Sequence, residues 1–469
     1  MSDYNLRSLN LPVLRGGALR AFATALESGV GRTLLLGSLL KSGGIARLRE
    51  IELRESPLFL PFPPEADEPG RRGTRRGDAP SAKELARCAA LSPEGSPFAS
   101  AGDYAAAYAK GDTSPTDVAE RFLEAIAADR GSVKRLNPFI AVDPDELRRQ
   151  ATESTERYRR RRPISPLDGV PIAVKDEVDM APYPTTVGTS FLGSAPAAHD
   201  ATTVARLRAA GALLLGKANM HEIGINPTGH NIHHGHTRNP YNPDHDTGGS
   251  SSGPATAVAA GLAPIALGAD GGGSIRVPAA HCGLVGLKPT FGRVSGSGAA
   301  PLAPSVGHLG PIGAHTADVA LAYAILAGPD RNDPRTLAQP PVSIGEWNRD
   351  DAKGIVMGIY RPWFEHADGE VVARCDDLVR RLVEAGAEVR DIEIPDLDAI
   401  RIAHAVTILS EMASAMSDYP DHRSSFAPAT RLSLTLGRSF TGVDYLRAQR
   451  VRARAMRDLL AVVGEVELI

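Results

Sequence analysis

"TGGSSSGPATAVAAGLAPIALGADGGGSIRVPAAHCG", residues 247–283, contains more glycine and serine than a strand or helix of a folded core tolerates. Two glycines and three serines open the stretch, and three further glycines precede Ser274. Between these clusters, residues 253–261 favour a helix and residues 263–269 favour a strand. A helix followed by a strand returns the chain to the same end of a sheet. We therefore expect Ser250 and Ser274 to lie close together.

The second cluster is suited to binding negative charge. Three successive glycines, Gly271–Gly273, allow φ > 0 and can turn their N–H groups towards one point. Beside the Ser274 hydroxyl, such a nest would stabilise the oxyanion of a tetrahedral intermediate. The loop alone leaves two other interpretations open. One is a phosphate-binding loop, although the G-K-[ST] ending is missing, and the other is a plain glycine turn.

A serine nucleophile needs a base, and the sequence offers a lysine for this role. No histidine occupies an obviously suitable motif, but Lys175 ends the apolar strand predicted over residues 170–174. Burial would favour the neutral amine, which can act as a general base. The alternative is a solvated lysine at the end of a strand.

Alternating strand and helix patterns predict an α/β protein. Residues 170–174 read as a strand, 200–211 as a helix and 212–216 as a strand. Further along, residues 354–360 and 387–394 read as strands on either side of a helix whose apolar face runs from Val371 to Leu382. This order is typical of helices layered on a largely buried sheet.

The N-terminal region has a different character. Residues 1–60 read as amphipathic helices, with Phe22, Leu26 and Val30 on one stripe, and residues 61–83 read as a flexible linker before a domain over 84–469. The helices form either an arm packed on the main body or a surface that touches a bilayer or frames an apolar substrate entrance. The sequence leaves both interpretations open.

Composition excludes several classes of function. The 469 residues include 52 basic and 55 acidic side chains, a balance that does not favour nucleic-acid binding. The three cysteines, Cys88, Cys282 and Cys375, are widely spaced and read as free thiols in a reducing compartment. We find no pattern typical of a signal peptide or a membrane span, so the sequence predicts a cytoplasmic protein, with peripheral membrane association left open.

Six segments together resemble the amidase signature family, and within it the plant-type fatty acid amide hydrolases. They are residues 16–28, 102–122, 163–179, 217–231, 237–253 and 270–288. The resemblance implies an α/β/α sandwich with a large mixed sheet flanked by helices, plus an N-terminal helical arm. Because the chain stops at Ile469, it also implies that the C-terminal part of that fold is missing. Ala269 departs from the family pattern, which often has a hydroxyl residue there.

The resemblance assigns roles to residues of both clusters. Ser274 would be the acyl nucleophile, Lys175 the base, and Ser250, after a cis peptide bond, the relay between them. The oxyanion hole would consist of N–H groups of Gly271, Gly272, Gly273 and Ser274. Ser251 and Arg276 would support these groups.

The implied function is hydrolysis of a carboxamide through an acyl-enzyme, with fatty acyl amides or N-acyl amines as substrates and without a cofactor. The implied partner is a small-molecule amide, which could carry a long acyl chain. A homodimer stays open, because the sequence alone does not determine the oligomeric state. Two alternatives stay open. One is an amidotransferase subunit that supplies ammonia to a partner enzyme, and the other is an inactive, truncated homologue.

Other polar residues read as structural. A metal site at His230, His233, His234 and His236 lacks a convincing set of carboxylate or thiolate ligands, so these residues read as a polar loop near the active-site mouth. Lys217 reads as a structural lysine, and Asp176 as a hydrogen-bond anchor for loops.

Overall fold

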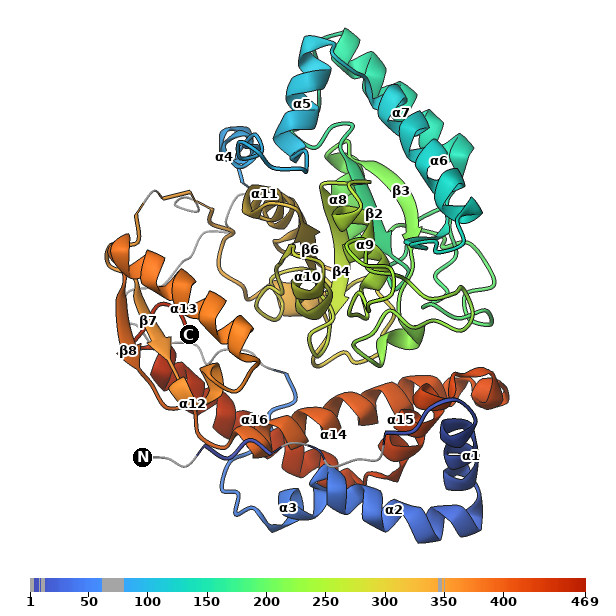
Figure 1. Cartoon of the computed structure of the whole chain (residues 1–469), viewed down its shortest axis with the longest axis vertical. Coiled ribbons are helices and arrows are strands. Elements are labelled where there is room, and N and C mark those ends of the chain that lie inside the picture. Colours follow the sequence, from blue (N-terminus) through green and yellow to red (C-terminus); the bar gives the residue numbers. More distant parts are fainter. Residues whose placement is uncertain (1–3, 8, 10–12, 61–79, 345–347, 350) are drawn as a thin grey trace. The chain divides into compact units, whose positions relative to one another are not determined.

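The computed structural model describes residues 4–7, 9, 13–60, 80–344, 348–349 and 351–469 (Figure 1). The described residues form two compact units. The central unit comprises Pro63–Gly345 and Asp418–Thr430. The terminal unit comprises Met1–Phe62, Glu346–Ser417 and Arg431–Ile469.

A six-stranded mixed sheet lies in the described part of the central unit, with the order β1-β3-β2-β4-β6-β5. Its strands are β1 (Phe139–Ala141), β2 (Pro171–Lys175), β3 (Leu213–Ala218), β4 (Ile265–Asp270), β5 (Val285–Gly286) and β6 (His308–Gly313). β2 is parallel to β3 and β4, whereas β1, β5 and β6 are antiparallel to their neighbours. β2, β3 and β4 are buried throughout, as expected for strands covered on both faces.

Helices flank this sheet (Figure 1). Those of the central unit are α4 (Ala82–Cys88), α5 (Ala101–Lys110), α6 (Pro115–Gly131), α7 (Pro144–Arg159), α8 (Thr202–Ala209), α9 (Ser252–Ala259), α10 (Arg276–His281) and α11 (Thr316–Leu326), with 3-10 turns at Glu222–Gly224, Pro334–Thr336 and Pro420–Ser425. Apolar side chains of α6, α7 and α9 pack with Ala173, Leu213 and Ala266 of the sheet. The strands and helices predicted between residues 170 and 269 are confirmed as β2, α8, β3, α9 and β4.

The register of β2 and β4 determines where the site forms. Ile172 pairs with Ile265 and Val174 pairs with Leu267 in parallel register. Parallel strands have their carboxyl ends at one edge of a sheet. The end of β2, at Lys175, and the glycine-rich loop after β4 therefore emerge side by side.

The terminal unit contains the helices from both ends of the chain. Its elements are α1 (Gly16–Glu27), α2 (Gly29–Gly43), α3 (Ile45–Glu50), β7 (Val356–Ile359), α12 (Arg361–Phe364), α13 (Gly369–Glu384), β8 (Glu388–Asp391), α14 (Leu397–Ala415) and α16 (Gly442–Val463). A 3-10 turn at Met416–Asp418 and α15 (Pro428–Ser439) extend across the division between the units. β7 and β8 are parallel, and they confirm the strands predicted on either side of α13.

The compact units do not follow the predicted domain boundaries. Ile45 and Leu48 of α3 share one apolar cluster with Ile402 and Val406 of α14 and Val451 of α16. This packing places the predicted N-terminal arm in one unit with the C-terminal helices. Most of the predicted linker, residues 61–79, lies outside the described residues, and its last residues belong to a capped helix start, because Ser81 accepts a hydrogen bond from Glu84 N at 3.3 Å.

The predicted stripe of Phe22, Leu26 and Val30 is wrong at its last member. Leu26 is buried, but Val30 is 76% exposed. The reason is Ser28, whose extended backbone ends α1 and whose hydroxyl accepts a hydrogen bond from Gly31 N to start α2. Val30 thus belongs to a second helix, on which Leu34 is 74% exposed. Contact of this segment with a bilayer stays a prediction.

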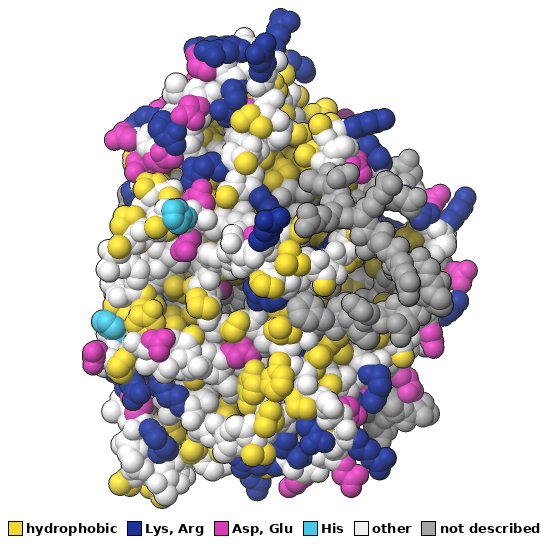
Figure 2. Space-filling model, turned by 180° about the vertical axis from the view of Figure 1, so that it is seen from behind, with side chains coloured by type: hydrophobic (Ala, Val, Ile, Leu, Met, Phe, Trp, Pro, Cys, Tyr) yellow, Lys and Arg dark blue, Asp and Glu magenta, His cyan; other side chains and the backbone are white. Residues whose placement is uncertain are grey.

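The surface agrees with the balanced composition. On the face shown in Figure 2, acidic side chains are interspersed among the basic ones. Among the described helices, we find none whose length and apolar character would let it cross a membrane.

Candidate active site

Lys175 and Ser250 meet at the edge of the sheet. The Lys175 amine donates hydrogen bonds to Ser250 Oγ at 2.9 Å and to the carbonyl oxygen of Ala269 at 3.2 Å. Both side chains are buried, with 0% exposure for Lys175 and 1% for Ser250. Two N–H groups of the amine are thus aimed at one hydroxyl and one carbonyl. The alternative of a solvated lysine at a strand end is wrong.

The backbone around Ser250 is tightly enclosed. The peptide bond between Gly249 and Ser250 is cis, as the resemblance implies. A methyl group on Gly249 would lie 2.2 Å from the carbonyl oxygen of Thr228, so only glycine fits. The carbonyl oxygen of Ser250 accepts a hydrogen bond from His221 N at 3.2 Å. These contacts fix the backbone at Ser250, from which the hydroxyl reaches Lys175.

Ser274 begins the turn that leads from the glycine loop into α10. Its carbonyl oxygen accepts a hydrogen bond from Ser251 N at 3.1 Å, which ties the two serine clusters together through the backbone. The residue is half-buried, and within the described parts of the chain its hydroxyl makes no hydrogen bond. The structure therefore brings Ser274 to the cluster that holds Ser250, with a hydroxyl free to meet a substrate.

Asp270 organises the glycine loop. Its carboxylate accepts hydrogen bonds from Gly273 N at 2.7 Å and Ile275 N at 3.0 Å. The Arg276 guanidinium adds two more, at 3.1 and 3.0 Å. Arg276 thus contacts the loop through Asp270, which the sequence analysis did not single out, and its supporting role stays a prediction.

One predicted oxyanion donor is otherwise engaged. Gly273 N–H points to Asp270, because the carboxylate three residues earlier closes the loop. The N–H groups of Gly271, Gly272 and Ser274 have no acceptor among the described residues. The prediction for Gly273 is therefore corrected, and the other three N–H groups stay available to an oxyanion.

Replacing Asp270 with asparagine is expected to lower the free energy of unfolding by about 3 kcal/mol at neutral pH. Burial would raise the pKa of Asp270, but hydrogen bonds from Arg276, Ile275 N and Gly273 N hold that pKa at about 2. The unfolded value is about 3.9, so the stabilisation is complete above pH 4 or so and is lost as the pH falls through about 2. Urea unfolding at several pH values checks both statements, and a difference that does not shrink in acid would contradict them.

Ser251 supports the base side of the site. Its hydroxyl donates to the Ala269 carbonyl oxygen at 3.2 Å and accepts from Ala269 N at 3.3 Å. The same carbonyl oxygen accepts the hydrogen bond from Lys175. These contacts place Ser251 beside the carbonyl oxygen that Lys175 contacts, and its supporting role stays a prediction.

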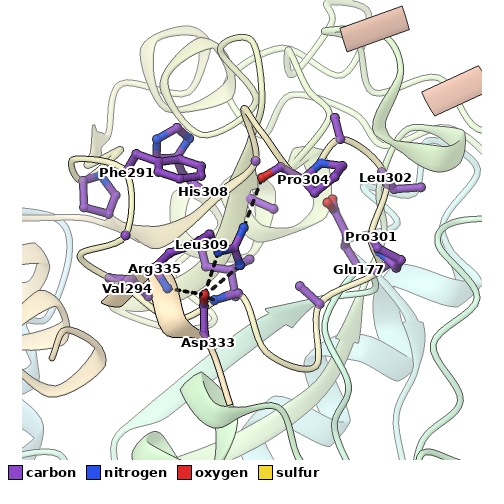
Figure 3. Close-up of a pocket in the computed structure, with 18 of the residues that line it drawn as sticks. Glu177, Phe291, Val294, Pro301, Leu302, Pro304, His308, Leu309, Asp333 and Arg335 are labelled. Carbon is purple, nitrogen blue, oxygen red and sulfur yellow. Dashed lines mark hydrogen bonds and ion pairs between the residues drawn. The ribbon is translucent and has the colours of Figure 1, made fainter. Parts of the chain in front are cut away.

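Glu177 is a second residue that the sequence analysis missed, after Asp270. Its Oε2 lies 2.7 Å from Lys175 Nζ, which makes a nearly buried ion pair. Glu177 also lines a pocket with a volume of about 110 Å³. Figure 3 shows it on one side of this pocket and the ion pair of Asp333 and Arg335 on another. No local signal in the sequence fixed its direction, because Glu177 lies two residues beyond the end of β2.

Lys217, the second buried lysine, makes contacts that hold neighbouring loops in place. Lys217 donates to the carbonyl oxygen of Val178 at 2.7 Å and to Thr185 Oγ1 at 2.9 Å, and it lies 3.3 Å from Asp176 Oδ1. Asp176 in turn accepts a hydrogen bond from Gly188 N at 3.0 Å. The predicted anchoring role of Asp176 is confirmed.

The four histidines of the 230–236 loop have separate partners. His233 Nε2 lies 2.5 Å from Glu222 Oε1, and His234 Nε2 lies 2.9 Å from the carbonyl oxygen of Thr189. His236 Nδ1 accepts from Asn231 N, and His230 lies 3.6 Å from Asp246. In the described residues, these contacts hold a loop in place and do not converge on one point.

Known proteins share this fold and sequence pattern. The family model described as Amidase matches residues 117–469. A fatty acid amide hydrolase of Oryza sativa subsp. indica is 36% identical over 476 residues, which cover 97% of this chain and 78% of the relative. A glutamyl-tRNA(Gln) amidotransferase subunit of Symbiobacterium thermophilum is 36% identical over 74% of this chain and 76% of the relative. The crystal structure of a peptide amidase from Stenotrophomonas maltophilia has a TM-score of 0.67 at 31% identity, covering 74% of this chain and 77% of that one.

These similarities show the class of protein: it is an enzyme that hydrolyses amides. The chain belongs to the amidase signature family, and its relatives include plant fatty acid amide hydrolases that match nearly its whole length. The resemblance drawn from the six segments is confirmed.

Proposed function

We propose that the protein cleaves a carboxamide through an acyl-enzyme on Ser274, and that its substrates are fatty acyl amides or N-acyl amines. The observation that carries the proposal is the buried hydrogen bond of 2.9 Å from the Lys175 amine to Ser250 Oγ. The buried amine of Lys175, in contact with the Ser250 hydroxyl, supplies the base that Ser274 needs to act as a nucleophile.

The acylation step follows from this contact. Lys175, in its neutral form, takes the proton of Ser250 while Ser250 takes the proton of Ser274, and the Ser274 oxygen attacks the carbonyl carbon. The N–H groups of Gly271, Gly272 and Ser274 stabilise the oxyanion. As the carbon–nitrogen bond breaks, the proton returns through Ser250 to the leaving amine. Water then hydrolyses the ester by the same route.

The preference for long acyl chains rests on the relatives. The fatty acid amide hydrolase of rice matches 97% of this chain, whereas the amidotransferase subunit of Symbiobacterium thermophilum matches 74%. Whole-length similarity to the first group supports a substrate with an apolar acyl part.

Hydrolysis of primary amides with acyl chains of 2, 6, 10, 14 and 18 carbons is expected to give values of kcat/KM that rise with length. Each buried methylene contributes about 0.8 kcal/mol at most, so even partial burial raises kcat/KM at least tenfold over this series. Release of the fatty acid, measured by mass spectrometry, gives the rates. A series in which short acyl amides are the better substrates would contradict the acyl preference.

The same assay addresses the amidotransferase alternative. Glutamine with the purified single chain is expected to give no ammonia above background. Ammonia from glutamine, with no hydrolysis of acyl amides, would favour a subunit that serves a partner enzyme.

A further inference from the structure

Glu177 is a carboxylate at the site that the acylation step does not use. Its side chain is 14% exposed, and that of Lys175, 2.7 Å away, is 1% exposed. A methyl group placed on Gly224 would lie 3.3 Å from Ser250 Oγ and 3.6 Å from Glu177 Oε2. The relay serine, the base and this carboxylate therefore surround one small volume.

The position of Glu177 is fixed by the backbone. Its carbonyl oxygen accepts a hydrogen bond from Ala300 N at 2.9 Å, which joins the turn after β2 to the segment that walls the pocket of Figure 3. Ala300 and Leu302 line that pocket together with Glu177. A molecule that fills the pocket would remove water from the carboxylate.

We propose that Glu177 is a positioning residue that accepts the ammonium proton of Lys175 when substrate fills the site, and so leaves Lys175 as a neutral base. This inference rests on the proposed function. Two opposite charges lose more stabilisation on leaving water than a neutral amine and carboxylic acid do. Substrate binding would therefore favour the neutral pair.

The proton transfer is balanced within the pair. One N–H bond of Lys175 breaks and one O–H bond of Glu177 forms, so the total charge of the pair stays zero. Lys175 then accepts the proton that Ser250 passes on from Ser274, and later returns it to the leaving amine. Glu177 returns its own proton to Lys175 when product leaves and water re-enters.

The titratable groups around this pair have other partners. They are Asp176 after β2, Lys217 in β3, Asp270 at the end of β4, Arg276 in α10, and His308, Asp333 and Arg335 on the pocket wall. Burial and the Lys288 ammonium lower the pKa of His308 to about 4. Burial raises the pKa of Asp333, but hydrogen bonds from Arg335 and Gly296 N outweigh it and lower that pKa. His308, Asp333 and Asp270 thus keep one charge state between about pH 6 and 9.

Glu177→Gln is the decisive variant, because it keeps the size of the side chain but cannot accept the proton. In the wild-type enzyme, a carboxylate 2.7 Å away can take up the proton of Lys175, and the variant has no such acceptor. The loss of activity in acid is therefore expected to lie at higher pH in the variant than in the wild-type enzyme. We expect kcat/KM to fall about 100-fold at pH 7 and less than about 10-fold near pH 9.5. An equal loss at every pH, or an unmoved acid limb, would overturn the proposal.

Two further variants make the test specific. Glu177→Asp keeps an ionisable group and is expected to restore the wild-type acid limb with a lower kcat. Asp176→Asn breaks the neighbouring pair with Lys217, 3.3 Å away, whose pKa burial lowers. The Asp176→Asn variant is expected to change kcat/KM by the same factor at every pH. A shift of the acid limb as large as that of Glu177→Gln would show a general charge effect and overturn the proposal.

A binding measurement tests the same transfer without altering Glu177. When Ser274→Ala protein binds a long-chain amide at about pH 7.5, calorimetry in buffers of different ionisation enthalpy is expected to detect no proton release. Release of one proton would mean that Lys175 loses its proton to solvent, which overturns the proposal. Full hydrolytic activity of Ser274→Ala would instead refute the proposed function, so the two failures are distinguishable.

Discussion

Ser274→Ala is expected to lower kcat for amide hydrolysis by about 10⁴-fold or more and to abolish labelling by a fluorophosphonate probe. The variant removes the attacking oxygen and leaves Lys175, Ser250 and the N–H groups in place. Because Ser274 is half-buried and its hydroxyl has no partner among the described residues, the fold is expected to persist. Intact-protein mass spectrometry measures the labelling.

Ser252→Ala is the matched control from the same sequence motif. The Ser252 hydroxyl donates to Thr237 Oγ1 at 3.2 Å and is completely buried at the start of α9. Its loss is expected to cost about 1 kcal/mol of stability and to leave labelling intact. Full labelling of Ser274→Ala would place the nucleophile elsewhere.

Lys175→Met is expected to slow acylation about 10³-fold at neutral pH. Methionine fills a similar buried volume, so the main change is the loss of the amine that contacts Ser250 and Glu177. The residual rate should rise with pH, because hydroxide then replaces the missing base. Single-turnover measurements over a range of pH values separate acylation from hydrolysis of the acyl-enzyme.

Lys217→Met distinguishes a catalytic lysine from a buried structural one. Lys217 holds the loop residues Val178 and Thr185. Its replacement is expected to lower the melting temperature strongly and to leave the pH dependence of acylation unchanged in the protein that remains folded. A Lys175→Met enzyme with near-normal acylation and pH profile would exclude Lys175 as the base.

The elements that build the site could be predicted from the sequence because their signals are local. The apolar runs before Lys175 and before Asp270 are bounded by glycine, and each became a buried strand. That β2 and β4 are neighbours in the sheet cannot be predicted from local signals, because the two strands lie far apart in the sequence. That Lys175 lies beside Ser250 followed from the resemblance to a known family. The parallel register of β2 and β4 brings Lys175 to the end of β4, and the hydrogen bond from Ser251 N to the Ser274 carbonyl oxygen ties the Ser250 segment to the loop after β4.

The missed features depend on side-chain direction after an element ends. Glu177 lies two residues beyond the last residue of β2, so strand alternation does not fix where its carboxylate points. The engagement of Gly273 by Asp270 required the conformation of a loop in which Gly273 has φ +122°. Val30 does not continue the apolar stripe of Phe22 and Leu26, because Ser28 ends one helix and caps the next.

The hydrogen bonds to the carbonyl oxygen of Ala269 have an evolutionary consequence. This oxygen orients both Lys175 and Ser251, and it belongs to the main chain. Any residue that preserves the strand supplies the same acceptor, so drift at position 269 can reshape the neighbouring pocket while the base keeps its anchor. Substitutions at position 269 could therefore change the range of substrates without changing the contacts of the base.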